Sequence, residues 1–94
     1  MKRLKHSQLS QDIKLKVKKT NEAIKQAKAL NLEKKLEKKI ELLISNRRHP
    51  SLDNKIIQPK YLKIWSFRID GKYRARYVFN HINEIEIYRV GDFH

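Results

Sequence analysis

Cysteine is absent from this sequence, glycine and proline occur twice each, and tryptophan occurs once. Without cysteine, disulfide bonds and thiolate metal sites are excluded. No apolar run approaches the roughly 20 residues that cross a bilayer. The basic start also lacks the apolar segment and small-residue cleavage site of a secretory signal. These absences predict a cytoplasmic protein that makes no membrane contact.

Acidic residues are scarce as well: ten aspartates and glutamates stand against 23 lysines and arginines, a formal net charge of +13 in 94 residues. Such a field attracts phosphate polymers, anionic surfaces or an acidic protein partner. Four scattered histidines without helical spacing or neighbouring cysteines do not suggest a metal site. We expect one domain over residues 1–94, because the length allows a single modest core, and we expect neither a metal nor a cofactor.

The composition changes at Pro50. Before it the chain has no glycine or proline and is rich in lysine, glutamate, leucine and isoleucine, which favour helices. After it come tyrosine, phenylalanine, tryptophan, valine and isoleucine, which favour strands. The sequence therefore predicts an α+β fold in which a helical layer packs on one sheet.

Apolar residues in the first half recur every three or four positions, the period of a helical face. They predict a helix over residues 8–28 and a second one that begins after an N-cap at Asn31 and ends near Asn46. A short connection makes the two a helical hairpin. Residues 1–6 are either an edge strand or a frayed terminus. The lysines between the apolar positions form a solvated face or, alternatively, a side that binds phosphates.

The second half predicts a meander of three antiparallel strands, over residues 62–69, 73–80 and 84–90. Asp70-Gly71 between the first two is typical of a type I′ hairpin turn, and a second turn is expected at residues 81–83. The segment 46–60 is predicted to be a basic loop in which Pro50 and Pro59 prevent a helix. Because residues 1–6 are either an edge strand or a frayed terminus, we expect three or four strands in all.

Alternation along these strands sorts their side chains into two faces. Trp65, Phe67 and Ile69 are expected beneath the helices, although Trp65 can instead stack on a nucleobase. Arg68, Arg74 and Arg76 gather on the opposite face. Whether Arg89 joins them depends on a pairing register that the sequence does not determine.

Guanidinium groups are always charged and offer a planar fork of donors that fits phosphate oxygens. Three of them on adjacent strands can hold one phosphodiester and stabilise the extra negative charge that develops if it reacts. The alternative interpretation is that these cations only face water and protect the sheet from pairing with another chain.

At this point the sequence resembles a known family. The segments "RRHPSLDNK", "WSFRIDGKYRARYVF" and "IEIYRVGD" are similar to those of the RelE/ParE superfamily of toxin-antitoxin toxins. The resemblance covers about residues 38–92, and the pattern "WS.RI…YR..Y" is its most specific part. It implies a short first strand and a helical hairpin packed on a twisted antiparallel sheet.

For the ribonucleases of this superfamily, the resemblance implies cleavage of mRNA in the ribosomal A site without a metal. The ribose 2′-hydroxyl attacks the adjacent phosphate and leaves a 2′,3′-cyclic phosphate and a 5′-hydroxyl. Arg74 matches the phosphate-stabilising arginine, with Arg68 as a supporting candidate. His94 is the candidate for acid-base chemistry, although it stands one position later than in the common "GDH" ending.

Six further cations are predicted to bind RNA: Arg76, Arg89, Lys63, Lys55, Arg47 and Arg48. The resemblance also implies a cognate antitoxin whose acidic tail covers the arginines. Two alternatives to the ribonuclease stay open. One is a ParE-like toxin that inhibits DNA gyrase by binding, and the other is a basic RNA-binding domain without catalysis.

Overall fold

The computed structural model of the chain describes residues 14–93. Its elements, in chain order, are β1 (Lys16–Lys19), α2 (Asn21–Ala29), α3 (Glu33–Ser45), a 3-10 helix (Pro50–Leu52), β2 (Lys55–Ile56), a second 3-10 helix (Lys60–Leu62), β3 (Trp65–Asp70), β4 (Tyr73–His81) and β5 (Glu84–Asp92).

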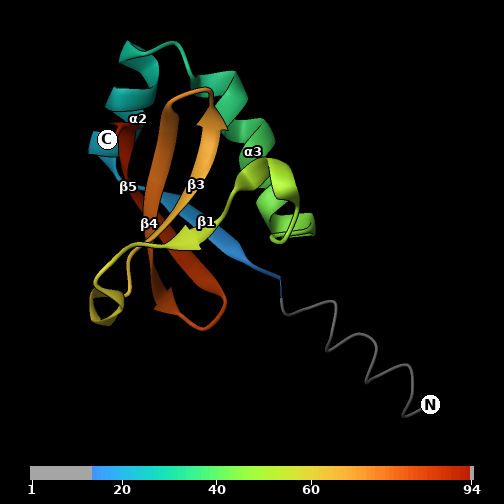
Figure 1. The fold of residues 1–94 in the computed structure, drawn as a ribbon. Coiled ribbons are helices and arrows are strands. Elements are labelled where there is room, and N and C mark those ends of the chain that lie inside the picture. The colour runs from blue at the N-terminus through green and yellow to red at the C-terminus, as the bar shows by residue number, and fades with distance from the viewer. Residues whose placement is uncertain (1–13, 94) are drawn as a thin grey trace, which may run out of the picture.

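The α+β fold class is confirmed: two helices pack on a single sheet (Figure 1). The sheet has five strands in the order β1-β5-β4-β3-β2, one or two more than predicted. The meander of β3, β4 and β5 is antiparallel as expected, but β1 pairs in parallel with β5. The sheet is therefore mixed, and the prediction of a purely antiparallel sheet was wrong.

The predicted helix over residues 8–28 was wrong at Lys16–Lys19 and is confirmed over residues 21–28. Residues 8–13 and the segment 1–6 lie outside the described part, and Lys16–Lys19 form a strand. Val17 packs its side chain against the core from that strand. Helix α2 starts only after Thr20, whose hydroxyl accepts a hydrogen bond from the Ala23 backbone N–H at 3.1 Å. Val17 and Thr20 fit the spacing of a helical face in the sequence, but Val17 lies on a strand and Thr20 is an N-cap.

The second helix is confirmed near its predicted bounds, but Asn31 is not its N-cap. Asn31 has a positive φ of 57°, and its N–H donates to the carbonyl of Lys28 while the N–H of Leu32 donates to Ala27. This is the hydrogen-bond pattern of a Schellman motif, in which asparagine tolerates the left-handed conformation. Asn31 thus ends α2, and Leu32 is the N-cap of α3.

The hairpin between β3 and β4 is present, but its turn lies one residue later than predicted. Asp70 pairs with Tyr73, which leaves Gly71 and Lys72 as the two turn residues. Only Gly71 has a positive φ, at 48°, whereas a type I′ turn needs positive φ at both central positions. The expected turn type was therefore wrong as well.

An irregularity between β4 and β5 changes which side chains share a face. Arg76 pairs with Arg89, but the next residue, Tyr77, pairs with Ile87. Tyr88 is thus an extra residue on β5, and a residue inserted in this way reverses the alternation beyond it. Val90 is buried on the helix side, and Arg89 is exposed opposite Arg76. Arg89 therefore lies on the side of the sheet opposite Ile85 and Ile87, a position that the sequence left open.

The core lies between the two helices and the sheet. Fully buried side chains from β3, β4 and β5 meet apolar side chains of both helices; the largest are Tyr77, Phe67, Leu36, Leu43, Leu52, Ile69, Ile85 and Ile87. Because both helices occupy one side of the sheet, the opposite side carries no helix within residues 14–93. None of the described helices is long and apolar enough to span a bilayer.

Candidate nucleic-acid interface

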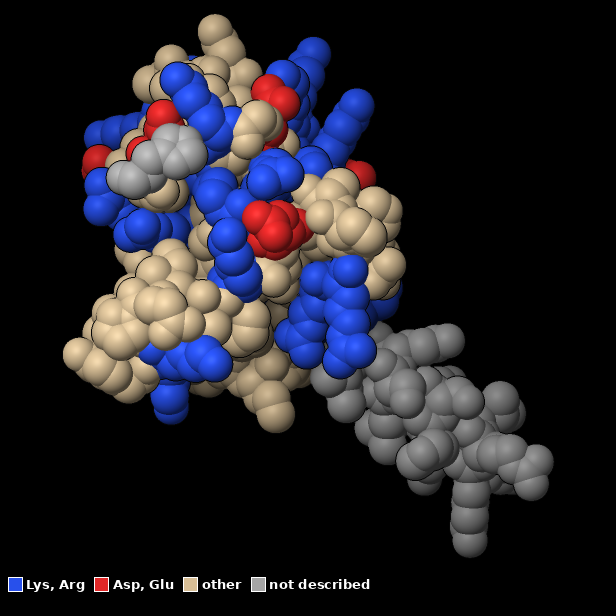
Figure 2. Space-filling view, viewed as in Figure 1, with Lys and Arg blue, Asp and Glu red and all other residues tan. Residues whose placement is uncertain are grey.

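The side of the sheet opposite the helices carries an arginine face, which we define as Arg68 of β3, Arg74 and Arg76 of β4, and Arg89 of β5. Pairing register brings these residues together, since Arg68 lies opposite Arg74 and Arg76 lies opposite Arg89. Figure 2 shows lysine and arginine side chains over much of the face in view, with few acidic groups among them. The pairing register thus brings Arg89 into this group, which the sequence had left open.

Arg74 is anchored within the protein. Its Nε donates to the Ser66 hydroxyl at 2.6 Å and its Nη1 to Oδ2 of Asp53 at 2.9 Å. Its Nη2 donates to the backbone carbonyls of Asp53, at 2.6 Å, and Ser66, at 3.2 Å. The side chain is only 13% exposed. These four contacts hold the loop at residue 53 against strand β3.

Asp53 is the acidic centre of one half of the arginine face. Besides Arg74, its Oδ2 lies 3.5 Å from Arg68 and 3.6 Å from the Nζ of Lys55. The hydrogen bond from Arg74, with the charges of Lys55 and Arg68, holds the pKa of Asp53 below its usual value. One carboxylate thus faces three cations, and this half keeps a net positive charge.

The other half of the arginine face has no acid. Among residues 14–93, no carboxylate forms an ion pair with Arg76 or Arg89. Both guanidinium groups instead lie over the ring of Phe93, at 4.2 Å and 5.4 Å from its centroid. The Nε of Arg76 is buried and has no hydrogen-bond partner in the described chain. A buried donor without a partner is costly.

Like charges directly opposite one another on neighbouring strands destabilise a sheet. Here the two pairs are treated differently: Asp53 compensates the pair of Arg68 and Arg74, whereas only an aromatic ring accompanies the pair of Arg76 and Arg89. A hollow of about 580 Å³ lies beside Arg68, Arg74 and Arg76, and Lys55 and Phe93 also line it. Its charge and donors suit a phosphate group.

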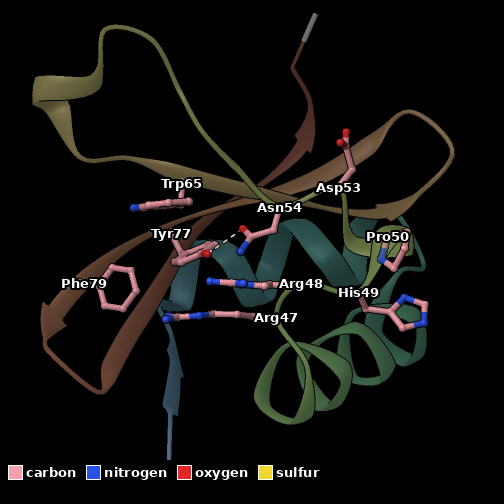
Figure 3. Close-up of a pocket in the computed structure, with 9 residues that line it drawn as sticks. All are labelled: Arg47, Arg48, His49, Pro50, Asp53, Asn54, Trp65, Tyr77 and Phe79. Atoms are coloured by element: carbon pink, nitrogen blue, oxygen red, sulfur yellow. Dashed lines mark hydrogen bonds between the residues drawn. The ribbon is translucent and has the colours of Figure 1, made fainter.

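A second cavity, of about 630 Å³, lies on the other side of the loop at residues 53–54. We call it the aromatic pocket and define it by Trp65, Tyr77 and Phe79 on one wall and Arg47 and Arg48 on the other. The Trp65 and Tyr77 rings stack with centroids 6.5 Å apart, and Phe79 meets Tyr77 edge-on at 6.0 Å. In Figure 3 both arginines extend toward these rings, and the side chains of His49 and Asp53 point away.

Asp53 and Asn54 connect the two cavities. Asp53 lines both of them and binds Arg74, whereas the side chain of Asn54 accepts a hydrogen bond from the Tyr77 hydroxyl at 2.8 Å. The Tyr77 side chain is buried, and burial raises the pKa of its phenol. The backbone of Asp53 is left-handed, with φ of 44°. This conformation directs two consecutive side chains to different partners.

The predicted site residues fall into three groups. Arg68, Arg74, Arg76, Arg89 and Lys55 gather at the arginine face, and Arg47 and Arg48 lie at the aromatic pocket. Lys63 follows the second 3-10 helix and lines neither of these two cavities of the described chain. His94, the acid-base candidate, lies outside the described residues.

Sequence reasoning missed four contributors: Asp53, Asn54, Phe79 and Phe93. The pair "DN" after "PSL" had a signal, because both residues tolerate left-handed backbone and bond to nearby groups. Phe93 had none, since cation-π contact depends on the register of β4 against β5. Trp65 is half-buried at the edge of the core and also lines the aromatic pocket, so its two alternative roles are compatible.

Comparison with solved structures identifies the fold. A YoeB/ParE toxin from Agrobacterium tumefaciens superposes with a TM-score of 0.68 at 13% identity, covering 85% of this chain and all of that one. The toxin in the DinJ-YafQ toxin-antitoxin complex of E. coli gives 0.63 at 15% identity, over 83% of this chain and 91% of that one. The YoeB-YefM toxin-antitoxin complex from Staphylococcus aureus gives 0.58 at 18% identity, with coverages of 85% and 97%.

The chain has the RelE/ParE-type toxin fold. No model of a known protein family matches its sequence, and no curated protein does so at a significant level. Within the RelE/ParE-type fold, the arginine face occupies the side of the sheet that the helices leave open, and the aromatic pocket lies at the start of β3.

Proposed function

We propose that the chain is the toxin of a type II toxin-antitoxin pair and inhibits translation by cutting mRNA. The observation that carries this proposal is the pair of Arg76 and Arg89, two cations held opposite each other with no acidic partner in the described chain. The shared fold with YoeB and YafQ toxins supports the toxin role. The net charge of +13 favours association with RNA.

The proposed reaction needs no cofactor. The ribose 2′-oxygen forms a bond to the adjacent phosphorus as the bond from phosphorus to the 5′-oxygen breaks. A base takes the proton of the 2′-hydroxyl, and an acid delivers a proton to the departing 5′-oxygen. The products are a 2′,3′-cyclic phosphate and a 5′-hydroxyl. His94 is the proposed acid-base group.

The arginines have distinct proposed roles. Arg76 and Arg89 bind the reacting phosphate and stabilise the negative charge that grows on it. Arg74 already uses its donors on Asp53 and Ser66, so we assign it to fixing the site and to contributing charge at short range. Arg68, which is half-exposed, and Lys55 bind the neighbouring backbone. Lys63 remains a candidate for a more distant RNA contact.

A cognate antitoxin is the proposed protein partner, and mRNA in the ribosomal A site is the proposed substrate. The YafQ and YoeB structures include complexes with the antitoxins DinJ and YefM. An acidic segment that neutralises Arg76 and Arg89 suits the cationic side of the sheet.

The internal hydrogen bonds of Arg74 favour a second candidate function. A ParE-like inhibitor of DNA gyrase needs no phosphate-reactive arginine, and a structurally committed Arg74 is compatible with it. The unpaired Arg76 and Arg89 favour the ribonuclease. Both candidates predict toxicity, so the test must distinguish how growth stops.

The test is controlled expression in bacteria of the wild type and of the double variant Arg76→Ala with Arg89→Ala, followed by growth measurement and mapping of mRNA 5′ ends. The double variant Lys34→Ala with Lys38→Ala on α3 removes the same charge and is the matched control. We expect arrest with new cuts in translated mRNA for the wild type and the control, and neither for the arginine variant. Arrest with DNA damage and no cuts supports gyrase inhibition, and growth without arrest contradicts the toxin role.

A further inference from the structure

The aromatic pocket is separate from the arginine face, and its chemistry is different. One wall of the pocket is aromatic and the other is cationic: Arg47 and Arg48 lie opposite Trp65, Tyr77 and Phe79 (Figure 3). Phe79 is 38% exposed, unusual for a phenylalanine on a central strand, and Trp65 is half-buried. A volume of about 630 Å³ is in the range of small-molecule sites.

The two arginines of the pocket are available for a ligand. Both are exposed, and within residues 14–93 neither guanidinium group takes part in a hydrogen bond or an ion pair. His49 is instead occupied, because its Nδ1 accepts a hydrogen bond from the Ser51 backbone at 3.1 Å. The two arginines of this pocket can therefore bind an anion, because no acidic group of the described residues is paired with them.

Aromatic rings that line a cavity together with free arginines match the chemistry of an unpaired nucleotide. Bases of single-stranded RNA stack on aromatic side chains while cations hold the backbone. Asp53 lines both cavities, so the pocket and the hollow at the arginine face lie on either side of one residue. A strand bound at the arginine face has a short path around the loop at residues 53–54.

We propose that the aromatic pocket is a second nucleotide subsite, in which a base of single-stranded RNA stacks on Trp65 or Phe79 and Arg47 and Arg48 hold its phosphates. This inference rests on the proposed function for its substrate class. It adds a contact away from the reacting phosphate. The subsite contributes to affinity and to the choice of sequence around the cut.

Trp65 makes the pocket directly observable, because it is the only tryptophan of the chain. A base that stacks on or beside its indole changes the fluorescence of the whole protein. The probe is a short single-stranded RNA with 2′-O-methyl groups, which lacks the attacking hydroxyl and is not cut. The same backbone without bases is the second probe, and an acidic peptide is the third.

We expect the 2′-O-methyl RNA to quench Trp65 fluorescence and the baseless strand to bind roughly tenfold more weakly without quenching. The double variant Arg47→Ala with Arg48→Ala is expected to bind about tenfold or more weakly and to lose the quenching. Phe79→Leu, which keeps an apolar side chain, should weaken binding severalfold. Lys34→Ala with Lys38→Ala is the charge-matched control and should keep the quenching.

Two results overturn the inference. If RNA binds the wild type, and the pocket variants bind it equally well with no change in Trp65 fluorescence, the base does not enter the pocket, while RNA binding at the arginine face stands. If the acidic peptide quenches Trp65 and RNA does not, the pocket belongs to a protein partner. Failure of the proposed function looks different, since Arg76→Ala with Arg89→Ala would then leave RNA binding unchanged. Circular dichroism of each variant verifies that it is folded.

Discussion

Arg76 lies directly opposite Arg89 on adjacent strands, and the ring of Phe93 is the group that both guanidiniums contact. Such a pair stores repulsion that an acidic neighbour usually removes. A few residues away, Asp53 does so for Arg68 and Arg74. Within the described residues, the sheet therefore contains one arginine pair that has an acidic neighbour and one that has none, and we expect the second to be where an anion binds.

Arg89→Gln should change the stability of the protein very little. Loss of a ring contact at 5.4 Å and relief of repulsion across the strands oppose each other, and each amounts to at most about 1 kcal/mol. Urea denaturation at low salt should give a free energy of unfolding within about 0.5 kcal/mol of the wild type. A loss above roughly 2 kcal/mol, which is typical of core damage, would show that Arg89 is a structural residue.

Asp53→Asn should destabilise the fold, because it weakens the contact that holds Arg74. Hydrogen bonds to charged groups contribute about 1.5–3 kcal/mol, and since the Asp53 side chain is 40% exposed we expect the low end, about 1.5 kcal/mol. Asp70→Asn is the control: that carboxylate forms an ion pair with Lys35, and both side chains are about half-exposed. A surface pair of this kind contributes little. Equal effects in urea denaturation would contradict the anchoring role of Asp53.

The same carboxylate predicts a pH dependence. The pKa of Asp53 is lowered in the folded state, chiefly by the hydrogen bond from Arg74. Its contribution is therefore fully present above about pH 4, the ordinary value for a carboxyl, and is lost as the pH falls through the folded pKa. Below pH 4 the wild type should lose stability more steeply than Asp53→Asn. Parallel curves of unfolding free energy against pH would argue that Arg74 does not hold this group ionised.

Tyr77→Phe should remove the hydrogen bond to Asn54 at 2.8 Å and cost about 1 kcal/mol. Burial raises the pKa of the Tyr77 phenol in the folded state. The contribution of the neutral phenol to the free energy of unfolding is therefore fully present below about pH 10, the ordinary pKa, and is lost as the pH rises through the higher pKa of the folded state. The variant should consequently lose less stability than the wild type between pH 9 and pH 11. Thermal unfolding at a series of pH values measures this, and an equal alkaline loss would contradict burial of the phenol.

Gly71→Ala should destabilise the β3-β4 hairpin by about 1 kcal/mol. No atom would contact the new methyl group, so the cost comes from the positive φ of 48°, which side chains with a Cβ disfavour. Gly91→Ala is the control, because its methyl group would meet the Phe93 ring at an ordinary 3.6 Å. Urea denaturation should separate the two variants, and equal stability would contradict strain at the turn.

Much of the fold could be predicted from the sequence because its signals are local. The composition change at Pro50 and the alternation around Gly71 were sufficient for a helical layer and a meander. The strand at Lys16–Lys19 was missed because four residues paired with distant β5 leave no periodic pattern of their own. Thr20 and Val17 fitted a helical period that tertiary pairing overrode.

The candidate site shows the same division. Alternation placed Arg68, Arg74 and Arg76 on one face, but the position of Arg89 depends on the extra residue at Tyr88. Asp53 approaches Arg74 from 21 positions away, and only the folded loop shows that this arginine already has partners. Like the pairing of Arg76 with Arg89, these relationships depend on register, which a single sequence leaves open.

The most direct test of the central claim is the salt dependence of RNA binding by purified protein. The wild type, Arg76→Gln with Arg89→Gln, and the control Lys34→Gln with Lys38→Gln would be titrated with single-stranded 2′-O-methyl RNA at several salt concentrations. Each phosphate contact adds about 0.7 to the slope of log affinity against log salt for single strands. We predict that the arginine variant lowers this slope by about 1.4 and weakens binding at least tenfold, while the lysine variant changes neither. Equal slopes for all three proteins would contradict a phosphate site at Arg76 and Arg89.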